Sequence, residues 1–195
     1  MLFRSQMIAK GHDFPNVTLV GVVLADAALH IPDFRSAEKT FQLLTQVAGR
    51  SGRAEKPGKV LIQTFHPDHF SLQHTLAHAY EKFADEELQH REALLYPPFS
   101  RLAQLRFAGK TAATVEAAAL QMKQFLAKLA GDKMKLLGPA PAPLAKIRGE
   151  YRYLMLVKSP GNKQLAWLLK NAQQHSLTLS KKVQMTIDID PLQML

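Results

Sequence analysis

The sequence predicts an α/β protein in two parts: an incomplete parallel-sheet lobe followed by a small α+β domain. Three observations support this prediction. Apolar runs of strand length flank a helical pattern in residues 1–66, adjacent prolines interrupt the chain at Pro97-Pro98, and the remaining segments follow the order β-α-β-β-α-β. We therefore predict domains at residues 1–66 and 99–195, joined by a helical connection over residues 67–98.

The first lobe is predicted from three consecutive segments. Val17 to Leu24 is a continuous apolar run, typical of a strand that is buried on both faces of a parallel sheet. Glu38 to Ala48 has a helical pattern that ends at Gly49, and Gly58 to Thr64 is a second apolar run. Strand, helix and strand in this order form a βαβ unit, and Asp26 then follows the carboxyl end of its first strand.

A long helical pattern over His66 to Ala93 forms the predicted connection, with Ser71 as a candidate cap. Tyr96-Pro97-Pro98-Phe99 ends it, because proline cannot continue the helical hydrogen bonds. Histidines four residues apart on a helix can share a metal ion. No further ligand of fixed geometry is evident beside them, so we predict no metal site at these four histidines: His66, His69, His74 and His78.

The second domain is predicted from alternating and periodic patterns that follow Phe99. The first strand alternates polar and apolar residues, the first helix has Thr111 as its N-cap and Gly131 after its end, and a proline-rich edge follows. The predicted elements are a strand at 101–107, a helix at 111–130, an edge segment at 136–143, a strand at 151–158, a helix at 164–175 and a strand at 183–190. This order is that of a split βαβ sandwich.

Composition and charge point to a polyanionic partner for the second half. The chain has no cysteine, which excludes disulfides and thiolate zinc sites, and no apolar run approaches the ~20 residues of a membrane span. The net charge is +9, but residues 1–95 carry 10 Lys and Arg against 11 Asp and Glu, whereas residues 96–195 carry 15 against 5. The basic half is the candidate for nucleic-acid binding, with a solvated basic face as the alternative. We expect a cytoplasmic protein.

The segment Gln46-Val47-Ala48-Gly49-Arg50-Ser51-Gly52-Arg53 is typical of a phosphate-binding arrangement. Arg50 and Arg53 carry forked, permanently charged donors that match phosphate oxygens, and the neighbouring glycines allow a close approach of the backbone. If the preceding helix ends at Ala48, both arginines follow it closely enough to reach one triphosphate. Solvated arginines in a loop are the structural alternative for a shorter pattern of this kind.

The pattern Q-x-x-G-R-x-G-R resembles motif VI of the superfamily 2 helicases, and Gln6 to Val20 resembles their motif V. The spelling K-G-H-D-F-P-N-V-T-L-V, followed by Asp33-Phe34-Arg35-Ser36-Ala37-Glu38 and Q-V-A-G-R-S-G-R, resembles the primosomal protein N′ family of replication-restart helicases. The resemblance extends over the whole chain from Gln6 onward. It implies the end of a RecA-like lobe followed by a C-terminal domain with a ribosomal-protein S10-like fold.

The resemblance also implies roles for individual residues. Arg50 and Arg53 would contact the γ-phosphate of ATP, with Gln46 orienting them or the attacking water. Asp13, Gly49 and Gly52 would line the nucleotide, although Asp13 is also a plausible turn residue before Phe14-Pro15.

In the same family pattern Lys10 and Gly11 would touch the DNA backbone. Ser5 keeps a hydroxyl for a phosphate, whereas Arg4 stands where the family has glycine. We expect Met1 to Ser5 to be a junction rather than native sequence.

The chain lacks the phosphate-cradling G-x-x-x-x-G-K-[ST] motif and the acidic magnesium-binding motif. The resemblance places both in the first RecA-like lobe, together with most contacts to ATP and Mg²⁺, and places cysteine-bound zinc elsewhere in the full-length family. We therefore expect a fragment that alone neither hydrolyses ATP nor unwinds DNA. The implied partners are forked and single-stranded DNA, single-stranded DNA-binding protein and other primosome proteins, with no membrane.

A basic segment, Lys146-Ile147-Arg148-Gly149-Glu150-Tyr151-Arg152-Tyr153, is the candidate DNA contact of the second domain. Lys146, Arg148 and Arg152 are suited to follow phosphates, and the tyrosines to stack on bases. The structural alternative is an ordinary hairpin whose tyrosines fill the core.

Two functions are thus open: an ATP-dependent 3′ to 5′ DNA helicase of replication restart, and a stand-alone nucleic-acid-binding module without ATPase activity. A RecG-type helicase is a weaker third, disfavoured by the basic second half.

Overall fold

The computed structural model describes residues 18–49 and 58–194, and it divides into two compact units, Met1–Gln89 and His90–Leu195. The division lies just before the predicted boundary at Tyr96-Pro98 and within the predicted connection, residues 67–98. Each unit is described by itself below. No helix among the described residues is long and apolar enough to cross a membrane.

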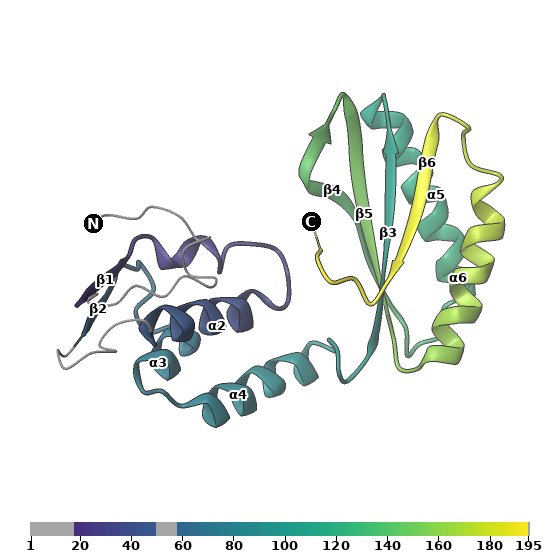
Figure 1. The fold of residues 1–195 in the computed structure, drawn as a ribbon. Coiled ribbons are helices and arrows are strands. Elements are labelled where there is room, and N and C mark those ends of the chain that lie inside the picture. Colours follow the sequence, from purple (N-terminus) through teal and green to yellow (C-terminus); the bar gives the residue numbers. More distant parts are fainter. Residues whose placement is uncertain (1–17, 50–57, 195) are drawn as a thin grey trace. The chain divides into compact units, whose positions relative to one another are not determined.

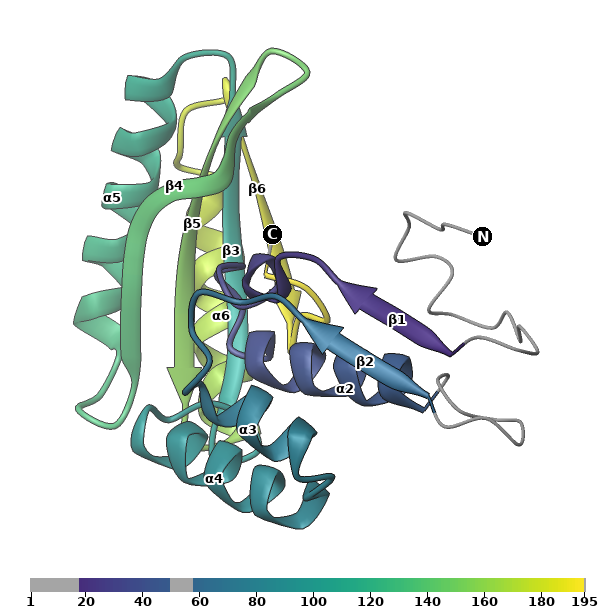
Figure 2. The ribbon, with the colours of Figure 1, turned by 90° about the vertical axis from the view of Figure 1, so that its left-hand side faces the viewer.

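The first unit contains a parallel strand pair with helices beside it (Figure 2). Val20 pairs with Val60 and Val22 with Ile62 in this pair. The elements in chain order are β1 (Leu19–Val22), the 3-10 helix η1 (Ala25–Ala27), α2 (Ser36–Ala48), β2 (Lys59–Ile62), α3 (Phe70–Leu76) and the first part of α4 (Tyr80–Ala93). The predicted βαβ unit is therefore present as β1, α2 and β2.

The predicted burial of the strands on both faces is wrong for the described part of the sheet. Leu19 in β1 is 58% exposed and Leu61 in β2 is 52% exposed, whereas Val22 and Ile62 pack beside the small core. The two strands alternate between exposed and half-buried residues. Only one face of the described strand pair is covered, which a continuous apolar sequence does not reveal.

The predicted single helix over His66 to Ala93 is also wrong, because the chain forms two helices there. α3 ends at Leu76, and His78 adopts a left-handed conformation with φ of 52° before α4 begins at Tyr80. The cap of α3 is His69 rather than Ser71, since the Ser71 backbone N–H donates to Nδ1 of His69 at 3.2 Å. The break lets α4 pack back on the unit through its aromatic residues.

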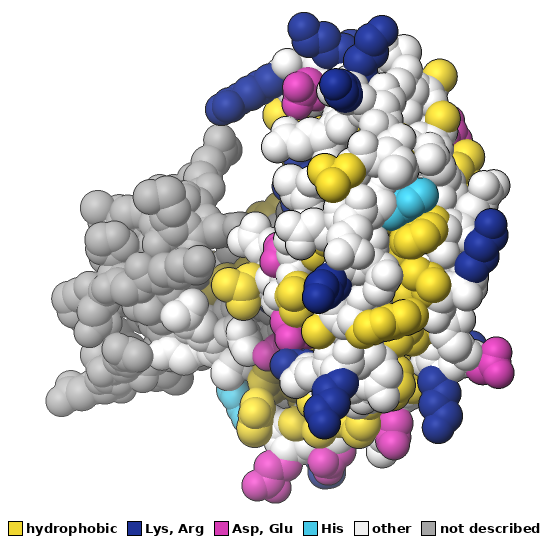
Figure 3. Space-filling model, turned by 90° about the vertical axis from the view of Figure 1, so that its right-hand side faces the viewer, with side chains coloured by type: hydrophobic (Ala, Val, Ile, Leu, Met, Phe, Trp, Pro, Cys, Tyr) yellow, Lys and Arg dark blue, Asp and Glu magenta, His cyan; other side chains and the backbone are white. Residues whose placement is uncertain are grey.

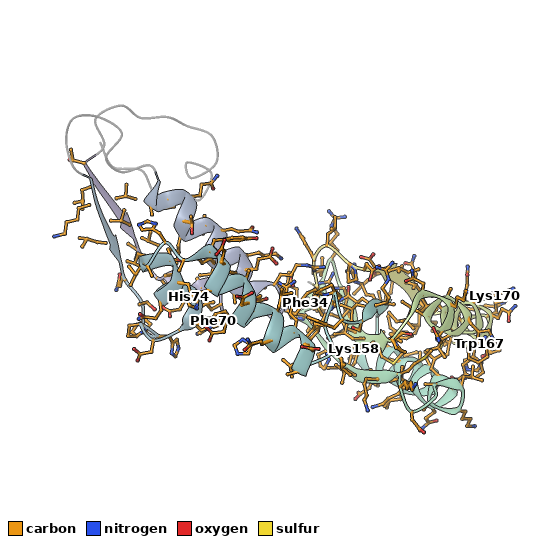
Figure 4. The ribbon with its side chains drawn as sticks, turned by 90° about the horizontal axis from the view of Figure 1, so that it is seen from below. Phe34, Phe70, His74, Lys158, Trp167 and Lys170 are labelled. Carbon is orange, nitrogen blue, oxygen red and sulfur yellow. The ribbon has the colours of Figure 1, made fainter. Side chains whose placement is uncertain are left out.

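Stacked aromatic rings join α2, α3 and α4. Phe83 stacks on Phe41 with ring centroids 4.2 Å apart and on Phe70 at 5.6 Å. Figure 4 labels Phe70 beside His74, on the same side of the unit. Offset stacking adds to the apolar burial of these side chains, so this cluster fixes the helices against one another. Leu44 and Leu72 are almost fully buried in a small core that they form with Ala25.

The second unit is an antiparallel sheet with two helices on one face (Figure 1). The strand order is β4-β5-β3-β6. Its elements in chain order are β3 (Arg101–Gly109), α5 (Ala112–Leu129), β4 (Lys135–Ile147), β5 (Glu150–Ser159), α6 (Asn162–Ser176) and β6 (Val183–Ile189). The first and last strands of the unit lie side by side and each helix connects two strands, so the predicted split βαβ order and α/β fold class are confirmed.

The core of the second unit lies between the sheet and the helices. Leu105 and Phe107 of β3 and Met155 of β5 are fully buried there, opposite Met122 of α5 and Leu168 of α6. Alternate residues of each strand face the helices, as the period of a strand requires. The predicted alternation in β3 is therefore the feature that placed this core.

The other face of the sheet is covered in part by the first and last residues of the same unit. The Lys158 Nζ donates to the Leu94 carbonyl at 2.8 Å and lies 3.3 Å from the centre of the Tyr96 ring. Burial lowers the pKa of Lys158. The amide of Gln104 reaches the carbonyl of Met194 at 3.4 Å. Figure 4 labels Lys158 within this unit.

Candidate nucleic-acid interface

The predicted nucleotide residues are only partly within the described part of the chain. Gln46 lies exposed on the last turn of α2, and Gly49 directly follows this helix, where its N–H donates to the carbonyl of Thr45 at 3.0 Å. The helix predicted to precede the two arginines is confirmed. The remaining predicted residues lie outside the described residues: Ser5, Lys10, Gly11, Asp13, Arg50, Gly52 and Arg53.

The carboxyl end of α2 is by itself unfavourable for phosphate binding. The carboxyl end of a helix carries a partial negative charge, which disfavours an anion. Gln46 and Gly49 are therefore suited to a phosphate only if cationic side chains accompany them. The sequence supplies such side chains at Arg50 and Arg53.

Asp26 follows the carboxyl end of β1, and its side chain is used inside the protein. It is 2% exposed, and it accepts hydrogen bonds from the Thr64 hydroxyl at 2.7 Å and the Phe65 backbone N–H at 2.9 Å. Burial raises the pKa of Asp26, but these hydrogen bonds outweigh burial and lower it overall. Asp26 thus ties the segment after β1 to the segment after β2.

Three of the four histidines considered as metal ligands have separate partners, and the fourth, His78, is exposed. His69 caps α3, and His74 Nε2 lies 2.8 Å from a Glu86 carboxylate oxygen on α4. The ring of His66 lies beside that of His30, with centroids 5.9 Å apart. Across residues 18–49 and 58–194, no three potential ligand side chains gather as a metal site. The absence of a metal site stays a prediction.

The basic segment of the second unit forms the β4–β5 hairpin. Ile147 pairs with Glu150, so that Arg148 and Gly149 form a two-residue turn with φ of 50° and 83°. Positive φ at both positions defines a type I′ turn, the geometry that matches the twist of paired strands. The turn presents Arg148 at the tip of the hairpin, where its side chain is exposed.

Arg152 has a structural role within the hairpin. Its Nε and Nη2 donate to the carbonyl of Leu144 at 3.1 and 3.0 Å. The β4–β5 register shifts between Pro141 and Lys146, which takes Leu144 out of the regular pairing. The guanidinium therefore supplies hydrogen bonds across the irregular stretch. Of the other two predicted cations, Lys146 is exposed and donates to the Tyr151 hydroxyl, and Arg148 is exposed in the turn.

The two tyrosines of the hairpin are held in place by neighbouring side chains. Tyr153 packs against the core, and its hydroxyl donates to a Glu116 carboxylate oxygen at 3.3 Å. Burial and the Glu116 carboxylate raise the pKa of Tyr153. Tyr151 is half-buried, and the Lys146 ammonium lies 4.6 Å from its ring centre and 3.3 Å from its hydroxyl. The alternative of tyrosines serving the domain interior therefore applies to Tyr153.

Further cations that the sequence reasoning missed lie at the same end of the sheet as the hairpin tip. Figure 3 shows Lys and Arg side chains gathered at the top of this unit, the end that carries the hairpin tip in Figure 1. Lys110 follows β3, and Lys181 and Lys182 precede β6. These residues are far apart in sequence, and only the strand order brings their loops together. The sequence pattern gives the order of the elements, and the strand pairing of the folded sheet places these loops side by side.

Comparison with known proteins identifies the family. Residues 92–192 match the primosomal protein N C-terminal domain. The chain belongs to this family, which confirms the resemblance seen in its sequence.

Curated relatives named replication restart protein PriA match the chain over nearly its whole length. Identity is 48% over 197 residues with the protein of Bacillus subtilis, 41% over 191 residues with that of Haemophilus influenzae and 42% over 196 residues with that of Synechocystis. These alignments cover 100%, 98% and 98% of the chain, but 24%, 26% and 23% of the relatives. The chain thus spans about a quarter of their length.

Proposed function

We propose that this chain is the C-terminal part of an ATP-dependent 3′ to 5′ DNA helicase that restarts replication at stalled forks in the cytoplasm. The observation that carries the proposal is the β4–β5 hairpin, which holds exposed Lys146 on β4 and exposed Arg148 in its turn, in the basic half of the chain. Family membership supports the same role. In this proposal residues 90–195 contact forked DNA, and residues 1–89 supply one side of an ATP site.

The proposed nucleotide site uses the sequence at the end of α2. Bound with Mg²⁺, ATP supplies the phosphoryl-transfer chemistry that drives unwinding. Arg50 and Arg53 would neutralise negative charge on its phosphates, Gln46 would orient these arginines or the attacking water, and Gly49 and Gly52 would allow close approach of the backbone. In the same proposal Asp13 would contact the nucleotide, whereas Ser5, Lys10 and Gly11 would contact the DNA backbone. The proposed partners are single-stranded DNA-binding protein and primosome proteins.

DNA binding by the chain is tested with fluorescence anisotropy of a labelled fork across a salt series. We expect the double variant Lys146→Gln/Arg148→Gln to bind about tenfold or more weakly, with a smaller salt dependence, because two phosphate contacts are lost. The matched control is Lys128→Gln/Lys133→Gln, which removes the same charge from exposed positions near the carboxyl end of α5. If both double variants lose the same affinity for the fork, the hairpin has no specific role and the binding is a non-specific attraction between charges. If the unmodified chain does not bind the fork, the DNA-contact role is refuted.

The helicase role is tested in a chimera. Residues 1–195 replace the matching segment of the Bacillus subtilis relative, which is 48% identical to them. We expect DNA-stimulated ATPase activity that Arg53→Ala abolishes and Lys128→Gln leaves unchanged. An Arg53→Ala chimera with full ATPase activity would remove Arg53 from the nucleotide site and favour a binding module without ATPase activity.

A further inference from the structure

A single row of residues crosses all four strands of the second unit at the end that carries the hairpin tip. Lys146 of β4 pairs with Tyr151 of β5, Tyr151 with Gly109 of β3, and Gly109 with Val183 of β6. Neighbouring strands lie ~4.8 Å apart, so three spacings make the row about 14 Å wide. Loops that are distant in sequence therefore open side by side along this edge.

Cations occupy this edge from β4 to β6. We name the group the basic rim, and it consists of Lys110, Lys146, Arg148, Lys181 and Lys182. All five side chains are exposed. Within the residues that the structure describes, none of them forms an ion pair with a carboxylate. The rim is thus a positive surface whose charge is not neutralised by the described part of the chain.

The backbone holds the parts of the rim close together. A Cβ atom added to Gly109 would lie 2.7 Å from the carbonyl oxygen of Lys182, so the end of β3 and the start of β6 are in direct contact. Lys110 follows this glycine, and Lys182 belongs to the strand connection that it touches. The positions of these two cations are therefore set by strand pairing rather than by a mobile loop.

Arg148 adopts a left-handed backbone conformation that is unfavourable for a long side chain. Its φ is 50°, at the first turn position, where Asn, Asp or Gly is favoured and a long side chain is not. Residues that keep an unfavourable backbone conformation cluster at functional sites. An arginine at the apex of the hairpin adds positive charge to the rim at the expense of turn stability.

We infer that the basic rim binds the phosphate backbone of a double-stranded DNA arm without reading its bases. The inference rests on the proposed DNA-binding role and gives it a site and a form of DNA. Single-stranded DNA is bound largely by stacking bases on exposed aromatic rings. Here the Tyr153 hydroxyl donates a hydrogen bond to Glu116, and the Tyr153 ring packs against the core. The ring of Tyr151 lies against the Lys146 ammonium. A wide array of fixed cations suits the two closely spaced phosphate backbones of a duplex.

The test compares a blunt duplex with a single strand of equal length, each labelled and titrated with the whole chain across a salt series. The variant Lys110→Gln/Lys181→Gln/Lys182→Gln removes the part of the rim that lies outside the hairpin. We expect its duplex affinity to fall at least tenfold at low salt and the slope of log K against log salt to decrease by about 2 to 3. The control Lys128→Gln/Lys133→Gln/Lys163→Gln removes equal charge elsewhere and should change the slope by less than about 1.

The outcomes separate this inference from the proposed function. One outcome is that the rim variant and its control have the same duplex affinity while Lys146→Gln/Arg148→Gln still loses fork binding. In that case the rim is not the duplex site, and the DNA-binding role of the chain stands. Equal losses on duplex and single strand overturn the duplex assignment. A second variant, Arg148→Asn, relieves the left-handed strain and should unfold at a higher denaturant concentration yet bind duplex more weakly. Undiminished binding by this stabilised variant removes Arg148 from the site.

Discussion

Gly109→Ala is expected to destabilise the second unit although it changes only one hydrogen to a methyl group. The added Cβ would lie 2.7 Å from the Lys182 carbonyl oxygen and 3.0 Å from Cγ2 of Val115. The first of these neighbours is backbone, so it cannot move aside by changing a rotamer. The contact can be relieved only by shifting the start of β6 away from β3.

The magnitude follows from two opposing contributions. Forcing a methyl group into a packed region costs about 1–3 kcal/mol, and replacing glycine by alanine regains about 0.4–1 kcal/mol by restricting the unfolded chain. We expect a net loss of about 1–2 kcal/mol. For a unit of this size, each kcal/mol corresponds to a lowering of Tm by about 4–8 °C.

The assay is urea unfolding followed by the fluorescence of Trp167. It is the only tryptophan in the chain and lies half-exposed on α6, where Figure 4 labels it near Lys170. Its signal therefore reports on the second unit. Gly131→Ala is the matched control, because a Cβ at Gly131 meets no atom within 4 Å.

The changes in the free energy of unfolding caused by the two variants should differ in sign or clearly in size. Gly131→Ala should leave the free energy of unfolding unchanged or raise it slightly. If Gly109→Ala is as stable as the unmodified chain, the close contact between β3 and the Lys182 backbone does not exist in solution. The structural basis for placing Lys110 and Lys182 in one rim would then be refuted as well.

Three further perturbations test individual buried and paired groups. Burial raises the pKa of Asp33, but hydrogen bonds from Lys39 and a backbone N–H outweigh it and lower the pKa below 3.8. Its stabilising contribution is therefore fully present above pH 3.8 and is lost below that value, as the pH falls through the lowered pKa of the folded state. Asp33→Asn should accordingly cost about 1–3 kcal/mol at neutral pH and progressively less in acid, measured by circular dichroism. Lys158→Ala should cost about 1–3 kcal/mol in urea unfolding, because it deletes a buried hydrogen bond, whereas Lys158→Met should retain more stability by keeping the packing. The pKa of Tyr153 is raised above 10.0, so its stabilising contribution is lost as the pH rises above that value, through the raised pKa of the folded state. Tyr153→Phe should remove a step of the phenolate absorbance titration that lies above pH 10.0, and Glu116→Gln should move that step to lower pH.

The sequence by itself determined most of the elements and the family. The alternation in β3, the helical stripe of α5 and the proline-rich edge at β4 correspond to local rules of period, capping and backbone geometry, and the structure has these elements close to their predicted bounds. The motif spelling likewise identified the family, since it depends on the order of residues alone. Local periodicity is written directly in the sequence, so these features could be predicted.

Tertiary structure decided which charged and aromatic residues are available to a ligand. The sequence does not distinguish Arg152 from Arg148. In the structure Arg152 donates hydrogen bonds to the Leu144 carbonyl across a register shift, whereas Arg148 lies in the turn. The break between α3 and α4 and the single covered face of β1 were equally invisible, because both depend on what packs against the segment. The gathering of Lys110 and Lys182 beside the hairpin arises from strand pairing between distant segments. Such pairing is a property of the folded sheet, and no local pattern specifies it.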